Sequence, residues 1–218
     1  SSDLPVDRSL LRYRRGCGLL LEAELASAPG PLDEAEHWLR RSFEDRPPAD
    51  LRAHVASHVG LVRAARLRAR FASTLDSAVV WKDLALERGT EVEAAFGRRV
   101  HPHDRGRLAL EMAGAAVEVL LRGHLAAREV AQRWLEVADA SIRAEHGRYD
   151  ATRRALERAR FHRACASWCD DPRELHEAPA ARALDVAAGS FPRDECPRLH
   201  AAVDEEREWW RARAALVD

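Results

Sequence analysis

The residues best suited to chemistry lie near the C-terminus, where cysteine and histidine recur at one-turn spacing. Cys165 and Cys169 are four residues apart, as are Cys196 and His200, and His162 lies just before the first pair. Residues at this spacing share a helix face, so two such faces in contact would offer three thiolates and one imidazole, a tetrahedral zinc set. The spacing is not that of a C-x2-C knuckle, and buried cysteines commonly act as small apolar side chains. The sequence therefore favours no cofactor, with zinc as the alternative.

A second pair with catalytic potential is Arg52 and His58, in a segment whose composition predicts a helix. The pair resembles the Arg-x4–6-His motif of HEPN ribonucleases, and this resemblance implies phosphodiester cleavage. In a chain so rich in arginine, with 10 His, such spacings arise easily. A solvated arginine and an ordinary helix histidine are the favoured interpretation. The sequence has no glycine-rich phosphate loop and no nucleophile elbow, so we expect a protein that is not an enzyme.

Arginines and tryptophans supply candidate contacts for a protein or peptide partner. Arginine binds carboxylates in a two-pronged geometry, and a set in the middle of the chain could grip an acidic partner: Arg63, Arg66, Arg68, Arg107 and Arg122. A solvated face is the favoured alternative. Trp209 and Trp210 are neighbours, so on a helix they point about 100° apart. One of them is a candidate for an exposed contact, and packing against the rest of the fold is the alternative.

The charge balance argues against nucleic acid as a partner. The chain holds 35 Lys plus Arg and 36 Asp plus Glu, mixed along its length, whereas a nucleic-acid binder normally shows a basic excess or stripe. The sequence has no apolar run of about 18 residues and no secretory signal, and its four Cys do not make a disulfide scaffold. We expect a cytoplasmic protein without a membrane segment. Ser1 in place of Met suggests a tag remnant, a processed end or a fragment.

Helices must position all of these residues. Ala, Leu, Arg and Glu dominate the 218 residues and are strong helix formers, and nothing is typical of a strand. Apolar residues make up 46% of the chain and charged residues 33%, which is typical of a globular domain. The sequence predicts an all-α fold.

Two markers recur along the chain and indicate a repeat. Four segments begin at an aspartate, a residue that caps helix N-termini well: Asp7, Asp50, Asp104 and Asp150. Glycine follows the first three after 10 or 11 residues (Gly18, Gly60, Gly114), and tryptophan after 30 or 31 (Trp38, Trp81, Trp134). We expect the glycines to let the second helix of a pair approach the first. We expect each tryptophan to fill the space between neighbouring pairs.

These markers predict stacked antiparallel helix pairs in a single domain. The units are about 7–49, 50–103, 104–149 and 150–195, with a capping helix in 196–218. The predicted first helices are Asp7–Ala26, Asp50–Ala72, Asp104–Ala126 and Asp150–Trp168. The predicted second helices are Leu32–Asp45, Leu75–Phe96, Ala127–Glu145 and Leu175–Ala188, and the cap is Pro197–Leu216.

The pattern resembles the tetratricopeptide repeat. The resembling residues are the glycine of the first helix and an Ala-x-x-x-large-x-x-small pattern in the second, as in Ala35-Leu39-Ser42, Ala131-Leu135-Ala138 and Ala180-Leu184-Ala187. The segment DRGRLALEMAGAAVEVLLRG is similar to degenerate repeats found beside caspase-like CHAT domains in bacteria. The units exceed the 34 residues usual in that family, the first-helix Tyr is missing, and unit two departs at Lys82. The resemblance implies an α-solenoid scaffold that binds a protein or peptide in a groove lined by its first helices.

A competing resemblance leads to another function. The segment LVRAARLRARFASTLDSAVVWKDLALERGTEV, followed by DRGRLALEMAGAAVEVLLRG, is similar to the ligand-binding half of a TetR-type repressor. That resemblance implies a helical bundle with a closed apolar pocket for a small molecule, in a two-fold dimer. The N-terminal helix-turn-helix of the family is missing from this sequence. A metal-binding or HEPN-like enzyme is the third alternative.

Overall fold

The computed structural model describes residues 5–44, 51–142 and 147–215, and all regular structure in these ranges is helical. The α-helices are α1 (Pro5–Ala26), α2 (Leu32–Glu44), α3 (Leu51–Phe71), α4 (Leu75–Phe96), α5 (Pro102–Leu120), α6 (Arg128–Ser141), α7 (Arg148–Trp168), α8 (Glu174–Gly189) and α9 (Pro197–Ala214). Two short 3-10 turns, Gly97–Arg99 and Leu125–Ala127, precede α5 and α6. The predicted all-α fold is confirmed. Within these ranges no helix combines the length and the apolar character needed to cross a bilayer.

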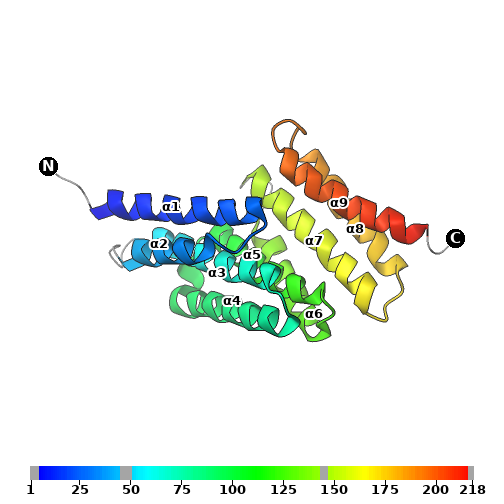
Figure 1. Ribbon diagram of the computed structural model, residues 1–218, viewed down its shortest axis with the longest axis horizontal. Helices are drawn as coiled ribbons and strands as arrows, with labels where there is room; N and C mark the ends of the chain where they lie inside the picture. The colour runs from blue at the N-terminus through cyan, green and yellow to red at the C-terminus, as the bar shows by residue number, and fades with distance from the viewer. Residues whose placement is uncertain (1–4, 45–50, 143–146, 216–218) are drawn as a thin grey trace.

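Consecutive helices pack as four pairs, α1 with α2, α3 with α4, α5 with α6 and α7 with α8. The other extensive contacts join helices of neighbouring pairs, such as α3 with α5, and α9 packs against α8 and α7. In Figure 1 the pairs follow one another along the long axis, from α1 at one end to the last turn of α9 at the other. The chain order is therefore also the spatial order.

The Ala-x-x-x-large-x-x-small pattern marks the buried face of each second helix. Its three positions are buried in α2, α6 and α8, and also at the aligned positions of α4: Ala35, Leu39, Ser42; Ala131, Leu135, Ala138; Ala180, Leu184, Ala187; Ala78, Lys82, Ala85. Leu39, Leu135 and Leu184 at the large position are at most 2% exposed. The helical period thus predicts which face packs inward. In α4 a lysine occupies the leucine position, and its ammonium group reaches the exposed Asp83 at 2.6 Å.

Helix α5 forms the centre of the largest core. All of its residues from Leu108 to Leu120 are buried, because α3, α4, α6 and α7 surround it. Small residues permit this crowding. A Cβ on Gly89 of α4 would lie 2.3 Å from the Met112 sulfur, and one on Gly106 would lie 2.6 Å from Ile142 Cγ1.

The predicted role of the repeat glycines needs correction. Gly60 is a close-approach site, with Leu39 Cδ2 only 2.9 Å from a built Cβ, but Leu39 belongs to the preceding pair rather than to the partner helix α4. Gly114 of α5 likewise faces Arg66 of α3. A Cβ on Gly18 would have no described neighbour within 4 Å, while one on Gly16 would lie 2.7 Å from Leu39 Cγ. Gly60 and Gly114 therefore fit neighbouring units together, whereas within the first pair Gly16, not Gly18, lets α2 approach α1.

The predicted aspartate caps are wrong where the structure describes them. Asp7, Asp104 and Asp150 are each the third residue of their helix. Proline at the first helical position, where its missing N–H costs nothing, starts α1 and α5 earlier than predicted. The side chain of His101 caps α5 by accepting from the His103 N–H. Asp50 and the predicted helix ends Asp45, Glu145 and Leu216 lie outside the described residues, and α5 ends at Leu120 rather than Ala126.

The repeated tryptophans do not share one role. Trp134 is buried in the core. Trp38 and Trp81 are half-buried and lie under the guanidinium groups of Arg15 and Arg68, whose Cζ atoms are 4.4 and 4.7 Å from the ring centroids. Only Trp134 therefore fills the interior as predicted.

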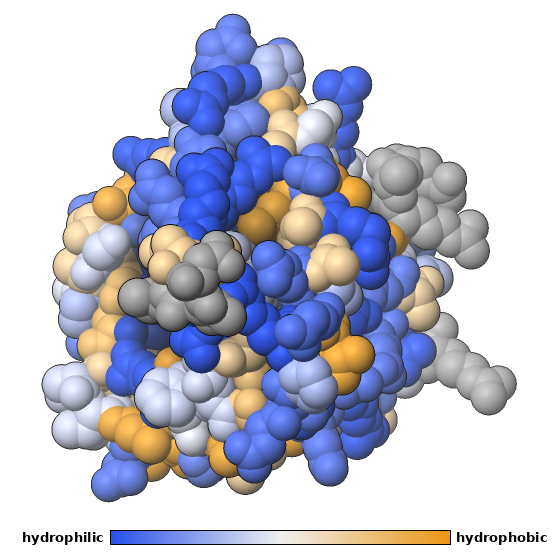
Figure 2. Space-filling view, turned by 90° about the vertical axis from the view of Figure 1, so that its right-hand side faces the viewer, coloured by the Kyte–Doolittle hydropathy of each residue, from blue (hydrophilic) through white to orange (hydrophobic). Residues whose placement is uncertain are grey.

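The end of the molecule seen in Figure 2 is largely hydrophilic, with apolar side chains in small separate patches.

Candidate functional site: a charged groove between the first helices

The most developed hollow of the molecule lies where α1, α3, α7 and α9 converge. It consists of two adjoining cavities of about 230 and 720 Å³. They share six lining residues: Glu24, Arg70, Tyr149, Leu199, Ala202 and Glu205. We call the two together the inner groove. No residue of α2, α4, α6 or α8 lines it.

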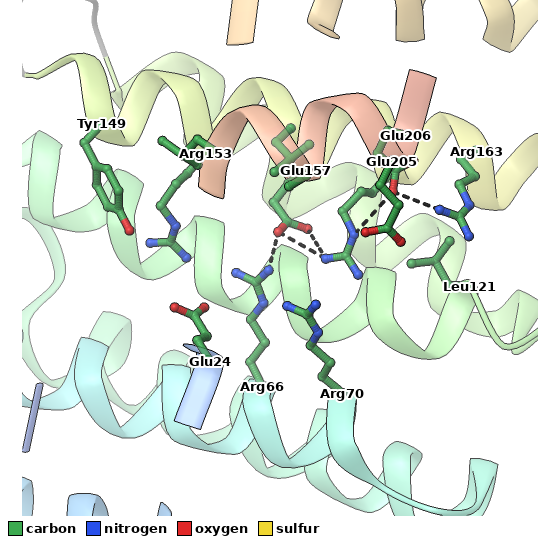
Figure 3. A pocket seen from close by; sticks show the side chains of 14 residues that line it. Glu24, Arg66, Arg70, Leu121, Tyr149, Arg153, Glu157, Arg163, Glu205 and Glu206 are labelled. Atoms are coloured by element: carbon green, nitrogen blue, oxygen red, sulfur yellow. Dashed lines mark hydrogen bonds and ion pairs between the residues drawn. The ribbon is translucent and has the colours of Figure 1, made fainter. Parts of the chain in front are cut away.

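The inner groove brings the first unit opposite the last. Glu24 near the end of α1 and Glu205 on the capping helix α9 line the same cavity, although seven helices, α2 to α8, lie between them in the sequence. Figure 3 shows α3 and α7 contributing Arg66 and Glu157, which point toward each other at its base. The groove is therefore lined by α1, α3, α7 and α9, together with Leu121 directly after α5 and the segment before α9.

A buried ion-pair network forms the base of the groove. It joins four arginines to four glutamates from α3, α5, α7 and α9: Arg66, Arg153, Arg160, Arg163, Glu111, Glu118, Glu157 and Glu206. Arg66 and the four glutamates are each at most 5% exposed. Buried charges are tolerated only when paired, and here the numbers of positive and negative groups are equal.

The geometry of the network is that of charge-assisted hydrogen bonds. Arg66 donates to Glu111 at 3.1 Å and also to Glu157. Arg160 holds both carboxylate oxygens of Glu118 at 2.9 Å, and Arg153 donates to the other oxygen of Glu111 at 2.8 Å. One network thus ties three units and the capping helix together.

The arginines of this network lower the pKa of two of its acids, Glu111 and Glu118. Burial alone would raise the pKa of Glu111, but the neighbouring guanidinium groups of Arg153 and Arg66 outweigh it and hold the pKa at about 2. The same balance, with Arg160 as the main cation, lowers the pKa of Glu118. For Glu206 burial prevails and raises the pKa, although Arg163 and Arg160 oppose it. Its Oε2 is buried without a partner.

Gly114 explains how Arg66 enters the core. A Cβ at Gly114 would lie 2.5 Å from the Arg66 Cζ, so only glycine leaves room for the guanidinium group against α5. Gly114, which was predicted to let two helices pack closely, therefore leaves the space that the buried guanidinium group of Arg66 occupies.

The five arginines predicted to grip a partner are engaged within the protein. Arg63 pairs with Glu24, and Arg68 pairs with Glu36 at 3.2 Å and with Asp33. Arg107 lies 3.7 Å from Asp150. Arg122 donates to the carbonyl oxygens of Arg70 and Ala72 at 2.7 Å each, satisfying the C-terminal end of α3. Arg66 is buried in the network, so a surface role for it is wrong.

The tryptophan pair is split between core and surface. Trp210 is 8% exposed and packs with Leu184 and Val203. Trp209 is half-buried between Arg163 and Arg213, each 5.2 Å from its ring centroid. Neither side chain is the fully exposed contact that the sequence allowed.

The predicted zinc set does not assemble. Cys165 and Cys169 lie at the C-terminal end of α7, whereas Cys196 lines the groove beside Tyr149 at the N-terminal end of α7. Sixteen residues of helix separate these points, or roughly 24 Å at 1.5 Å per residue. His200 instead contacts the Phe191 carbonyl at 2.9 Å. In the ranges that the structure describes, no group of three or more His, Cys, Asp or Glu side chains is placed to hold a metal ion.

His162 belongs to a different cluster. Its Nδ1 lies 3.2 Å from Nδ1 of His176, whose Nε2 lies 3.2 Å from Asp171 Oδ2. Burial, followed by the charges of His176, Arg158 and Arg182, lowers the pKa of His162 to about 4. This cluster ties α7 to α8.

The HEPN-like pair does not converge either. Arg52 is exposed and lies 3.9 Å from Asp104, whereas His58 packs against the Phe43 ring at 4.7 Å between centroids. Six residues on a helix turn the side chains about 120° apart, so the two groups do not form a ribonuclease site.

Sequence reasoning missed the groove residues that remain accessible. Arg70, Tyr149 and Leu21 were not singled out, although Arg63, Arg66 and Arg70 follow one another at the three- and four-residue spacing of a single helix face. That spacing was the available signal. The partners across the groove come from distant helices and left no local pattern.

Comparisons with known proteins add little to this geometry. No protein-family model matches the chain, and no curated protein matches it. Among solved structures, one described as "DHF58 filament" is similar over 94% of this chain and 98% of its own, with 18% sequence identity and a TM-score of 0.34. A similarity of that extent carries no argument about function.

Proposed function

We propose that the protein is a non-enzymatic helical-repeat scaffold, similar in plan to a tetratricopeptide α-solenoid, that holds a segment of a partner protein in the inner groove. The observation that carries this proposal is the lining: α1, α3, α7 and α9 enclose the groove, and the second helices contribute nothing to it. A concave face built from first helices is the binding surface that stacked helix pairs provide.

Apolar side chains at the rim support the same function. Leu21 and Leu25 on α1 are 47% and 44% exposed and face the larger cavity. Leu199 and Ala202 of α9 line it from the other side. A polypeptide segment offers side chains for such walls and backbone amides for the charged base. A TetR-like ligand core would instead need a closed apolar chamber, and the larger described cavity carries charged residues on its walls.

Selection from a phage-displayed random peptide library tests the proposal. Peptides should be recovered on the wild-type protein and should lose binding to a Leu21→Asp/Leu25→Asp variant, because charge on the α1 wall prevents apolar contact. The matched control is Val80→Asp/Val186→Asp, which alters exposed valines of α4 and α8 outside the groove. Failure to enrich any peptide, or equal binding to both double variants, would contradict the groove as the binding surface.

A further inference from the structure

Arg70 differs from the four arginines of the buried network at the base of the inner groove. Arg66, Arg153, Arg160 and Arg163 each have a glutamate partner. Arg70 lines both cavities and is exposed, and within the described part of the chain its guanidinium group has no hydrogen-bond or ion-pair partner. In Figure 3 it extends from α3 toward α7 beside Arg66, and no interaction joins it to the side chains drawn.

The surroundings of Arg70 combine apolar walls with acidic groups. Leu21, Leu25 and Leu199 line the larger cavity with it. Glu195 and Glu205 lie on the α9 side, and Glu24 on the α1 side is paired with Arg63. Arg198 adds a second exposed cation at the start of α9. These acids would repel a polyphosphate chain more strongly than a single carboxylate, because the repulsion grows with the number of negative charges. Arg70 therefore suits a single carboxylate in an apolar setting.

The position of Arg70 indicates which kind of carboxylate fits. Because it lines both cavities, it lies where they join, and an occupant that reaches it can continue into each. A side-chain carboxylate within a chain meets that geometry, whereas a C-terminal carboxylate would leave one cavity empty. Glu205, which has no described partner, is available to accept from backbone N–H groups of the same segment.

We propose that Arg70 is the anion anchor of the inner groove, and that the groove recognises a peptide segment with an internal Asp or Glu flanked by apolar residues. The inference rests on the proposed function and adds the chemistry of the partner. Arginine suits this role because its planar guanidinium group holds a carboxylate through two parallel hydrogen bonds.

Fluorescence polarisation with the dye-labelled peptides recovered from the display selection tests the anchor. Arg70→Gln should weaken their binding roughly ten- to a hundredfold, as expected for loss of a charge-assisted pair, and Arg70→Lys should restore part of it. Arg182→Gln, an exposed arginine of α8 outside the groove, is the matched control. Replacing the internal Asp or Glu of each peptide by its amide should weaken wild-type binding equally. The same replacement in the peptide should cause no further loss of binding to the Arg70→Gln variant.

The outcomes separate the anchor from the groove. Peptides that need Leu21 and Leu25 but bind Arg70→Gln as well as wild type would overturn the anchor and leave the scaffold function standing. Dependence on a free C-terminal carboxylate instead of an internal one would also overturn it. If no peptide binds in the groove, both the function and the anchor are wrong. If Arg70→Gln unfolds at the same temperature as the wild-type protein, any loss of peptide binding is not caused by a loss of fold.

Discussion

At the scale of single residues, Arg66 places a positive charge in the interior that must be paired with glutamates. Its guanidinium group is 5% exposed and meets Glu111 and Glu157 from two other helices. Replacing a buried ion pair by apolar groups can be neutral, but removing one partner leaves an uncompensated buried charge. Replacing a single charged residue of the network should therefore destabilise the fold, whereas replacing an arginine together with its glutamate partner by apolar residues should be tolerated.

Arg66→Met should destabilise the protein by about 3–5 kcal/mol in urea unfolding at neutral pH, because Glu111 and Glu157 lose a shared cation. Arg182→Met, at an exposed arginine for which the described ranges show no ion pair, should change stability by less than about 0.5 kcal/mol. Equal urea midpoints for the two variants would show that the network contributes no net stability.

His162 predicts an acid sensitivity at the contact between α7 and α8. Its pKa is lowered to about 4 in the fold, against about 6.5 for an unperturbed histidine. Above about pH 6.5 the side chain is neutral in both states and costs nothing. As the pH falls from about 6.5 to about 4 the unfolded chain binds the proton first, so stability declines across that window.

His162→Gln should remove part of this decline, roughly 1–2 kcal/mol after allowance for solvent screening of a half-buried group. The measurement is the urea midpoint at several pH values between 4 and 7. The matched control is His37→Gln, which replaces an exposed histidine of α2, away from the contact between α7 and α8. An identical slope for wild type and His162→Gln would refute the assignment.

At the scale of helices, the local sequence pattern predicted the helices and their buried faces. It did not predict which side chains pair across the fold. The helix Leu75–Phe96 has the predicted bounds, and the Ala-x-x-x-large-x-x-small positions are buried in all four second helices. Period and propensity are local properties. The partners of Arg66 lie 45 and 91 residues away, so no local signal distinguished it from a solvated arginine. The starts of α1 and α5 were misplaced because proline at the first position outweighed aspartate as a cap, whereas α7 starts at Arg148, directly after Gly147.

Lys82 offers a test of the repeat pattern. It is 8% exposed at the position that holds leucine in the other second helices. Lys82→Leu should raise the stability of the fold by about 1 kcal/mol, since the leucine adds apolar contact and removes the need to desolvate an ammonium group. Lys82→Ala, which loses the aliphatic stem as well, should not stabilise. Thermal unfolding distinguishes them, and a lower midpoint for Lys82→Leu would mean that α4 does not follow the register of its counterparts.

At the scale of the whole molecule, four helices from separate parts of the sequence, α1, α3, α7 and α9, converge to form the groove. The sequence predicted pairs and a partner-binding face on the first helices, but it assigned that face to arginines that proved to be structural. The accessible residues Arg70, Leu21 and Leu199 become neighbours only because the first pair and the capping helix face each other. That closeness depends on packing between helices that are distant in the sequence, which no single segment encodes.

Hydrogen–deuterium exchange with and without a display-selected peptide shows whether the inner groove holds the partner. We expect slower exchange on peptide addition in the second half of α1, at the C-terminal end of α3 and in the first half of α9, where the groove is lined. It predicts little change in α4 and α6, which contribute no groove residue. Slower exchange confined to the second helices would contradict it.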